Sequence, residues 1–136
     1  MAKVDRAQKH FKGDSGVLTL LLDSIEQEDI GIWNRWRAQN LHTIPQLQGA
    51  NLSRTNLEHA LLNESILLEA NFTGANLRNP NLYSSFCERA NFTEGNLEVI
   101  NLAAADLTHA NLLKAYLGGA DTKPLGLAAR LLHTAR

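Results

Sequence analysis

Large apolar residues return at every fifth position along most of the chain. From Leu47 to Leu117, fifteen consecutive positions spaced by five are apolar, and we call these positions centres. Most centres have a small residue two places before them. An α-helix would rotate successive centres by about 140° around its axis, and a straight strand would send alternate centres to opposite faces. The spacing instead predicts a chain that turns a corner every five residues and points the same side inward each time. Such a chain is a solenoid.

The number of residues per coil can also be deduced from the sequence, because residues stacked in adjacent coils should resemble one another. ANFTGANL (70–77) matches ANFTEGNL (90–97) at six of eight positions, at an offset of 20 residues. Phe72 and Phe92, the two aromatic centres, are also 20 residues apart. We therefore predict four sides per coil and about four coils over residues 45–122.

The centres are predicted to fill the interior, where each buried Leu or Phe contributes about 1.5–3 kcal/mol. The residue before a centre is most often Asn, which can bond backbone at a corner or stack into an amide ladder between coils. Cys87 occupies a centre, so we expect a small buried hydrophobe rather than a reactive thiol. The predicted core consists of Leu52, Leu57, Leu67, Phe72, Leu77, Leu82, Cys87, Phe92, Leu97, Leu102, Leu107 and Leu112.

Both ends of a solenoid expose unpaired edges and need caps. Apolar residues at helical spacing predict a helical N-terminal cap over 14–44, after a basic, flexible stretch over 1–13. At the other end, LGLAARLLHTAR predicts a capping helix over 123–136.

Two details of the N-terminal cap stay open. Trp33 and Trp36 are predicted to cover the first coil, with a binding role as the alternative. Ser24 with Gln27 fits a capping box, whereas Asp14 or Ser15 could start an earlier helix. The pattern does not distinguish one long helix from two short ones.

The A-N-L-x-x and A-N-F-x-x units resemble the pentapeptide-repeat family, whose consensus is A-(D/N)-L-x-x. The resemblance covers about residues 45–122 and implies an all-β solenoid, a right-handed quadrilateral β-helix, here with helical caps at both termini. IWNRWRAQN resembles the segment before the coils in many cyanobacterial members. In some members the C-terminal segment makes a dimer, so a homodimer through the C-terminal helix is possible here.

The composition indicates a soluble domain in a reducing compartment. The chain is 44% apolar with a net charge of −1, which does not favour direct nucleic-acid binding, and its one cysteine rules out an internal disulfide. The apolar run 17–22 is far shorter than the ~20 residues of a membrane span, and the basic start is not typical of a secretory signal. We expect a cytoplasmic protein that does not contact a membrane.

No candidate catalytic chemistry emerges from the sequence. The histidines fall on different sides and in different coils, and neither a metal-ligand cluster, a phosphate-binding loop nor a nucleophile–base pair is apparent. We therefore expect a protein that is not an enzyme and needs no cofactor or metal. The five histidines are His10, His42, His59, His109 and His133.

The family supplies one specific alternative, because some members resemble B-DNA and bind DNA gyrase in its place as inhibitors or protectors. Four coils at about 4.8 Å make a rod of ~19 Å, and duplex DNA of that length carries roughly eleven charges. Residues 45–124 hold eight acidic and five basic side chains, and Glu58, Arg78 and Glu98 alternate in one column. The charge pattern favours neighbouring ion pairs over a continuous anionic stripe.

Most outward positions are polar, and the apolar exceptions cluster. Ile66 and Phe86 replace Asn before their centres and stack 20 residues apart; Leu68 shares their side, and Leu61 and Tyr83 lie on the adjacent side. Contiguous exposed apolar surface often marks a contact site. We predict that these five residues bind an unidentified protein partner, unless the N-terminal segment covers them. The expected function is a non-enzymatic scaffold or regulator in a bacterial cytoplasm.

Overall fold

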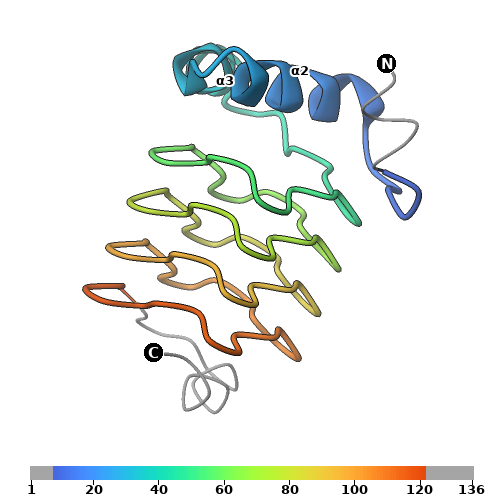
Figure 1. Cartoon of the computed structure of the whole chain (residues 1–136). Coiled ribbons are helices and arrows are strands. Elements are labelled where there is room, and N and C mark those ends of the chain that lie inside the picture. Colours follow the sequence, from blue (N-terminus) through green and yellow to red (C-terminus); the bar gives the residue numbers. More distant parts are fainter. Residues whose placement is uncertain (1–7, 122–136) are drawn as a thin grey trace.

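The computed structural model describes residues 8–121, which form a stack of coils beneath two helices (Figure 1). The helices are α2 (Ser15–Glu26) and α3 (Ile30–Gln39). The predicted C-terminal helix over 123–136 lies outside the described residues.

The coils are joined by parallel β-bridges, each of which links the residue before a centre to the residue 20 positions further along. One column runs through Gln46, Ile66, Phe86 and Asp106, and the next begins with Asn51 and Asn71. The bridges are isolated, and residues 8–121 contain no β-strand longer than a single bridge. This register confirms the predicted 20-residue coil with four sides.

Each corner depends on a left-handed backbone conformation. Every fifth residue from Gly49 to Gly119, two places after a centre, has a φ between 54° and 74°. Only three of these fifteen positions are glycine; the others carry side chains, such as Glu64 and Arg89. Because L-residues rarely adopt this region, the corners store local strain that the packed coils must hold.

Asn side chains support these corners. The Oδ1 atom of Asn71 accepts the N–H of Thr73 at 3.0 Å, and the same bond recurs at most positions where Asn precedes a centre. Asn76 also donates from Nδ2 to Oδ1 of Asn56 at 3.0 Å, one rung of an amide ladder. Both predicted roles of Asn are therefore present.

The interior of the coils is a continuous apolar column. All twelve core residues predicted above are at most 1% exposed. The rings of Phe72 and Phe92 stack with centroids 4.9 Å apart and planes 5° from parallel. Each coil thus buries its centres against the coils above and below it.

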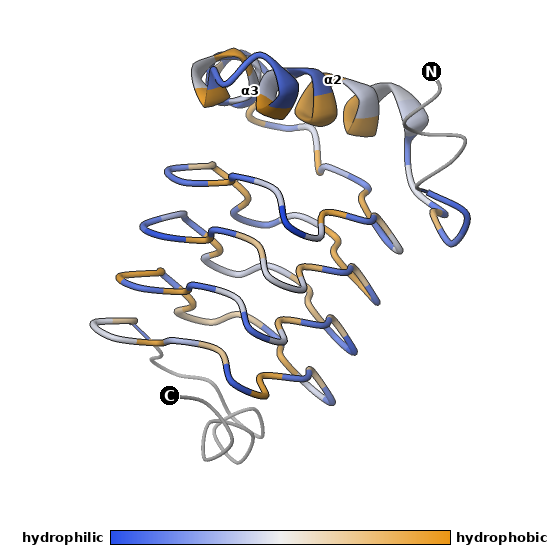
Figure 2. Cartoon of the chain, viewed as in Figure 1, coloured by the Kyte–Doolittle hydropathy of each residue, from blue (hydrophilic) through white to orange (hydrophobic). Residues whose placement is uncertain are grey.

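The N-terminal cap consists of two helices rather than one. Asp14 caps α2 by accepting the N–H groups of Gly16 and Val17, and Asp29 caps α3 by accepting that of Gly31. The apolar side of both helices faces the first coil (Figure 2). The apolar periodicity did not distinguish one long helix from two short ones, and the turn between α2 and α3 shows that there are two.

Of the two helix starts proposed for this end, the one at Ser24 is wrong. Ser24 does not start a helix, because it lies within α2 and its hydroxyl donates to the carbonyl of Leu20 at 2.8 Å. Residues 8–13 contact the first coil: the N–H of Lys12 donates to the carbonyl of Gln48 at 2.9 Å. A Cβ on Gly49 would lie 2.1 Å from the carbonyl oxygen of His10, so glycine allows this close approach.

Candidate interaction surface

The five predicted contact residues, which we call the apolar patch, lie on the side of the coils. Ile66 and Phe86 form a parallel bridge and stack in adjacent coils as expected. Phe86 is 47% and Tyr83 46% exposed, while Ile66, Leu68 and Leu61 are half-buried. Phe86 therefore faces outward at a position where most equivalent residues are Asn, and Tyr83 is exposed on the adjacent side.

The two stacked residues remove a structural hydrogen bond. At the next corner of the same coil, Asn71 Oδ1 accepts the N–H of Thr73, but Ile66 and Phe86 have no acceptor atom for the corresponding N–H groups of Leu68 and Glu88. The chain thus loses corner support at two adjacent levels and exposes apolar surface instead. Packing within the coil does not explain this exchange.

The lower border of the apolar patch is charged. Asp106 follows Phe86 in the same column, and its carboxylate accepts the hydroxyl of Thr108 at 2.6 Å and the N–H of Thr108 at 2.9 Å. These hydrogen bonds lower the pKa of Asp106. An ionised side chain therefore ends the apolar column at the fourth coil.

The N-terminal cap sits on the end of the coils, and within the apolar patch it contacts Leu61. Trp33 is fully buried and donates from Nε1 to the carbonyl of Leu61 at 2.9 Å, while Trp36 packs beside it with ring centroids 5.2 Å apart. This pair lies over the edge of the first coil, whereas Phe86 belongs to the third. The cap contacts the backbone at Leu61 and leaves Phe86 and Tyr83 about half exposed.

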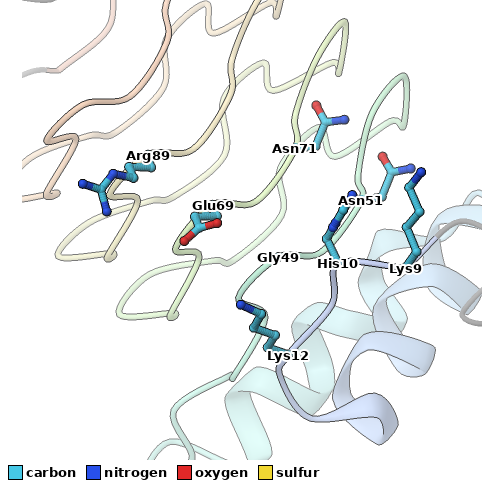
Figure 3. A pocket seen from close by; sticks show the side chains of 8 residues that line it. All are labelled: Lys9, His10, Lys12, Gly49, Asn51, Glu69, Asn71 and Arg89. Carbon is cyan, nitrogen blue, oxygen red and sulfur yellow. The ribbon is translucent and has the colours of Figure 1, made fainter.

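A polar recess forms where the N-terminal segment meets the coil corners, and sequence reasoning missed it. Figure 3 shows Lys9, His10 and Lys12 on that segment, and Glu69 and Arg89 at the same corner of successive coils. Its volume is about 550 Å³. Lys9, Lys12 and Arg89 outnumber the carboxylate of Glu69, so the recess is mainly positive, and these side chains are exposed to solvent. The recess forms where segments that are distant in sequence come together, and no local sequence pattern predicts such pairing.

The described residues do not form a metal-binding cluster. Within 8–121 no three His, Cys, Asp or Glu side chains come close enough to hold a metal ion. Cys87 is fully buried, and this burial raises the pKa of its thiol to about 12. None of the described helices is long and apolar enough to cross a membrane.

The column of alternating charge contains the ion pair expected from the sequence. Arg78 Nε lies 3.4 Å from Glu98 Oε2, with both side chains partly exposed. A guanidinium thus interrupts the acidic groups along this side of the coils.

The family model for pentapeptide repeats matches residues 46–79 and 87–121, in eight copies. These two ranges make up half of the chain. The unmatched stretch between them contains Pro80, Tyr83 and Phe86, so the break in the repeat coincides with part of the apolar patch.

Solved structures of pentapeptide repeat proteins resemble this chain. A protein from the Arabidopsis thaliana thylakoid lumen is 32% identical, with a TM-score of 0.53 over 54% of this chain and 50% of that one. Rfr23 from the cyanobacterium Cyanothece 51142 is 35% identical, with a TM-score of 0.34 over 55% of this chain and 54% of its own.

A third structure is HetL, a pentapeptide repeat protein involved in heterocyst differentiation regulation in Nostoc sp. strain PCC 7120. It is 24% identical, with a TM-score of 0.23 over 57% of this chain and 52% of its own. The matched region thus spans about half the length of each of these proteins. A comparison with curated proteins gives no match.

The five-residue period, the 20-residue register of the bridges and the matched family model agree with one another. The chain belongs to the pentapeptide repeat family.

Proposed function

We propose that this protein is a non-enzymatic interaction module or regulator whose apolar patch binds a protein partner. The observation that carries the proposal is the replacement of corner-supporting Asn by Ile66 and Phe86 at stacked positions. A rigid coil holds the two side chains in fixed positions, so binding costs little ordering entropy. The proposal takes from the family the right-handed quadrilateral β-helix, and it keeps the predicted bacterial cytoplasm as the location.

The chain itself supplies the best test variant. Asn stands at most equivalent positions, so Ile66→Asn/Phe86→Asn should restore the corner hydrogen bonds and remove the apolar surface together. We expect the variant to melt no lower than wild type and to bind its partner at least about tenfold more weakly, as for loss of buried apolar anchors. A protein recovered from the native lysate with wild type would be purified and its Kd measured against both forms.

Leu113→Thr is the matched control, because Leu113 is 49% exposed outside the apolar patch and its column otherwise holds Ser53, Thr73 and Thr93. It should bind as wild type does. Affinity should also change little with salt, since apolar contacts are not screened. Equal affinities of wild type and the double Asn variant for every recovered partner would reject the proposal.

DNA mimicry at gyrase is the alternative function. The Arg78–Glu98 pair weighs against it, because a mimic needs unbroken negative charge along the coils. Inhibition of gyrase supercoiling by the purified protein would favour the mimic instead.

A further inference from the structure

At the edge of the first coil that faces α2 and α3, a fixed set of backbone groups needs hydrogen-bond partners. In the second coil, the N–H of Asn76 donates to the carbonyl of Thr55, and the carbonyls of Asn76 and Arg78 accept N–H groups of the coil above. Each side of the first coil therefore presents one N–H and two carbonyls toward the cap, where another coil would otherwise lie. Buried backbone groups of this kind are nearly always paired.

The cap supplies all three partners on the side formed by residues 61–63. Asn34 Oδ1 accepts the N–H of Leu61 at 2.9 Å. The Leu61 carbonyl accepts from Trp33 and Arg37, and Arg37 Nη2 donates to the carbonyl of Asn63 at 2.6 Å. Side chains of α3 thus replace a missing strand here.

The N-terminal segment covers two further sides. The N–H groups of Lys12 and Asp14 donate to the carbonyls of Gln48 and Gln46, at 2.9 and 2.8 Å. On the next side, the Gln8 amide donates to the Asn51 carbonyl at 2.8 Å and accepts the N–H of Asn51. Backbone and side-chain groups therefore take the place of a strand on both sides.

On the side formed by residues 56–58, which we call the open side, none of the three groups has a partner among residues 8–121, whereas each of the other sides has at least two of them paired. The three groups without a partner there are the N–H and carbonyl of Asn56 and the carbonyl of Glu58. A groove of about 620 Å³ lies between the open side and the α2–α3 turn. Its wall includes Ile25 and Ile30 from the two helices.

We propose that the open side binds an extended peptide segment of a partner protein, carrying basic side chains, which adds a parallel strand to Asn56 and Glu58. An unpaired strand edge is a template for such addition, and its hydrogen bonds supply affinity that does not depend on peptide sequence. In the register of the lower coils, the third residue of a five-residue segment donates to the Asn56 carbonyl. The fifth donates to the Glu58 carbonyl, and the first accepts the Asn56 N–H.

The charge and polarity of the groove define the side chains of this segment. Three carboxylates line it, those of Glu28, Asp29 and Glu58, against the single guanidinium of Arg54. Asp29 lies 3.8 Å from Arg35, and Glu58 lies 3.7 Å from His59, which also lines the groove. Glu28 makes no ion pair with a described residue. Residues two and four of the segment would point outward and be basic, and the third would turn its apolar side chain toward Ile25 and Ile30.

The test uses the full-length protein and the peptide acetyl-Val-Lys-Leu-Lys-Val-amide. Amide hydrogen exchange, followed by NMR, should show the Asn56 N–H slowed about tenfold at a free peptide concentration near ten times the Kd. The Asn76 N–H, already bonded to Thr55, should change little. The matched control peptide carries N-methyl groups on its third and fifth residues, which removes both donors, and it should not protect Asn56.

Variants separate this site from the apolar patch. Glu28→Gln/Glu58→Gln should weaken peptide binding about fivefold, the effect expected when two exposed ion pairs are lost, whereas Glu64→Gln on the neighbouring side should not. Ile66→Asn/Phe86→Asn should bind the peptide as wild type does, so the two proposals can fail separately.

Three results would overturn the proposal. The N-methylated peptide could bind as tightly as the parent, which would exclude strand pairing. The Asn56 amide could already exchange slowly without peptide, or slow with protein concentration alone; the open side would then be occupied within the chain or by a second copy. Absence of binding by the parent peptide would equally reject it.

Discussion

The side chains of Ser65 and Ser85 show how one hydroxyl group can weaken or support an apolar interior. Both are buried in the same column of the coils. The Ser85 hydroxyl lies 3.3 Å from the sulfur of Cys87, whereas the Ser65 hydroxyl has no hydrogen-bond partner among the described residues. A buried hydroxyl without a partner loses its hydration without compensation.

Ser65→Ala is therefore expected to raise the free energy of unfolding by about 1 kcal/mol, because it removes an unsatisfied group. Urea unfolding of the wild type and the variant would measure the difference. Ser85→Ala is the matched control, and it should give no gain because the hydroxyl it removes is bonded. Equal gains in the two variants would contradict this account.

Cys87 links burial to the pH dependence of stability. Burial raises the pKa of its thiol from 9.0 to about 12, so between these values the unfolded chain releases a proton that the folded chain keeps. The stabilising contribution is complete below pH 9 and is lost as pH rises toward 12. We expect the free energy of unfolding to fall over this range, and less steeply in Cys87→Ala. Denaturant titrations at several alkaline pH values would test this, and parallel slopes in both proteins would refute it.

Among the structural elements, the corners depend most on residue type. Val99 sits at a corner with φ of 56°, although β-branched residues are the least suited to the left-handed region. Asn79 occupies the equivalent corner one coil earlier, and Asn tolerates this conformation better. The corner at Val99 is therefore strained by its side chain.

Val99→Asn should stabilise the protein by about 1 kcal/mol, which thermal and urea unfolding would detect. Val99→Thr keeps the β-branch and should give no comparable gain. If the two variants were equally stable, the strain would not lie in the branched side chain.

The repeat predicts the elements well, but it predicts their detailed geometry poorly. Phe72 and Phe92 signal the 20-residue offset, and their rings stack as that offset requires. The left-handed corners leave no such signal, because residues as different as Glu64, Arg89 and Val99 occupy them. Tertiary packing overrides local preference at these positions, since each corner is held by coils on either side.

For the whole molecule, the closure of the first coil depends on Arg37. This side chain is 7% exposed and donates to the carbonyls of Thr43, Leu61 and Asn63. One residue of α3 therefore fixes the cap to two carbonyls of the first coil and to the connecting segment at Thr43. Burial lowers the pKa of Arg37, and the negative charge of Glu64 opposes this shift.

Arg37→Ala should lower the free energy of unfolding by about 3 kcal/mol, as for loss of several charge-assisted bonds. It should also free the edge at Leu61 and Asn63 and promote self-association. Urea unfolding and sedimentation velocity would measure the two effects. Arg35→Ala, on the exposed side of α3, is the control and should change neither property. A monomeric Arg37→Ala variant with wild-type stability would disprove this role.

The sequence by itself determined the period of five, the 20-residue coil and the apolar interior, because the same inward position recurs in every repeat. It also located the stacked Ile66 and Phe86, whose departure from Asn is visible in any alignment of the coils. Only the tertiary structure decided that the N-terminal cap forms two helices and leaves Phe86 exposed. It alone revealed three closed sides and one open side of the first coil. The closed sides depend on hydrogen bonds between residues more than twenty positions apart, for which the local sequence carries no periodic signal.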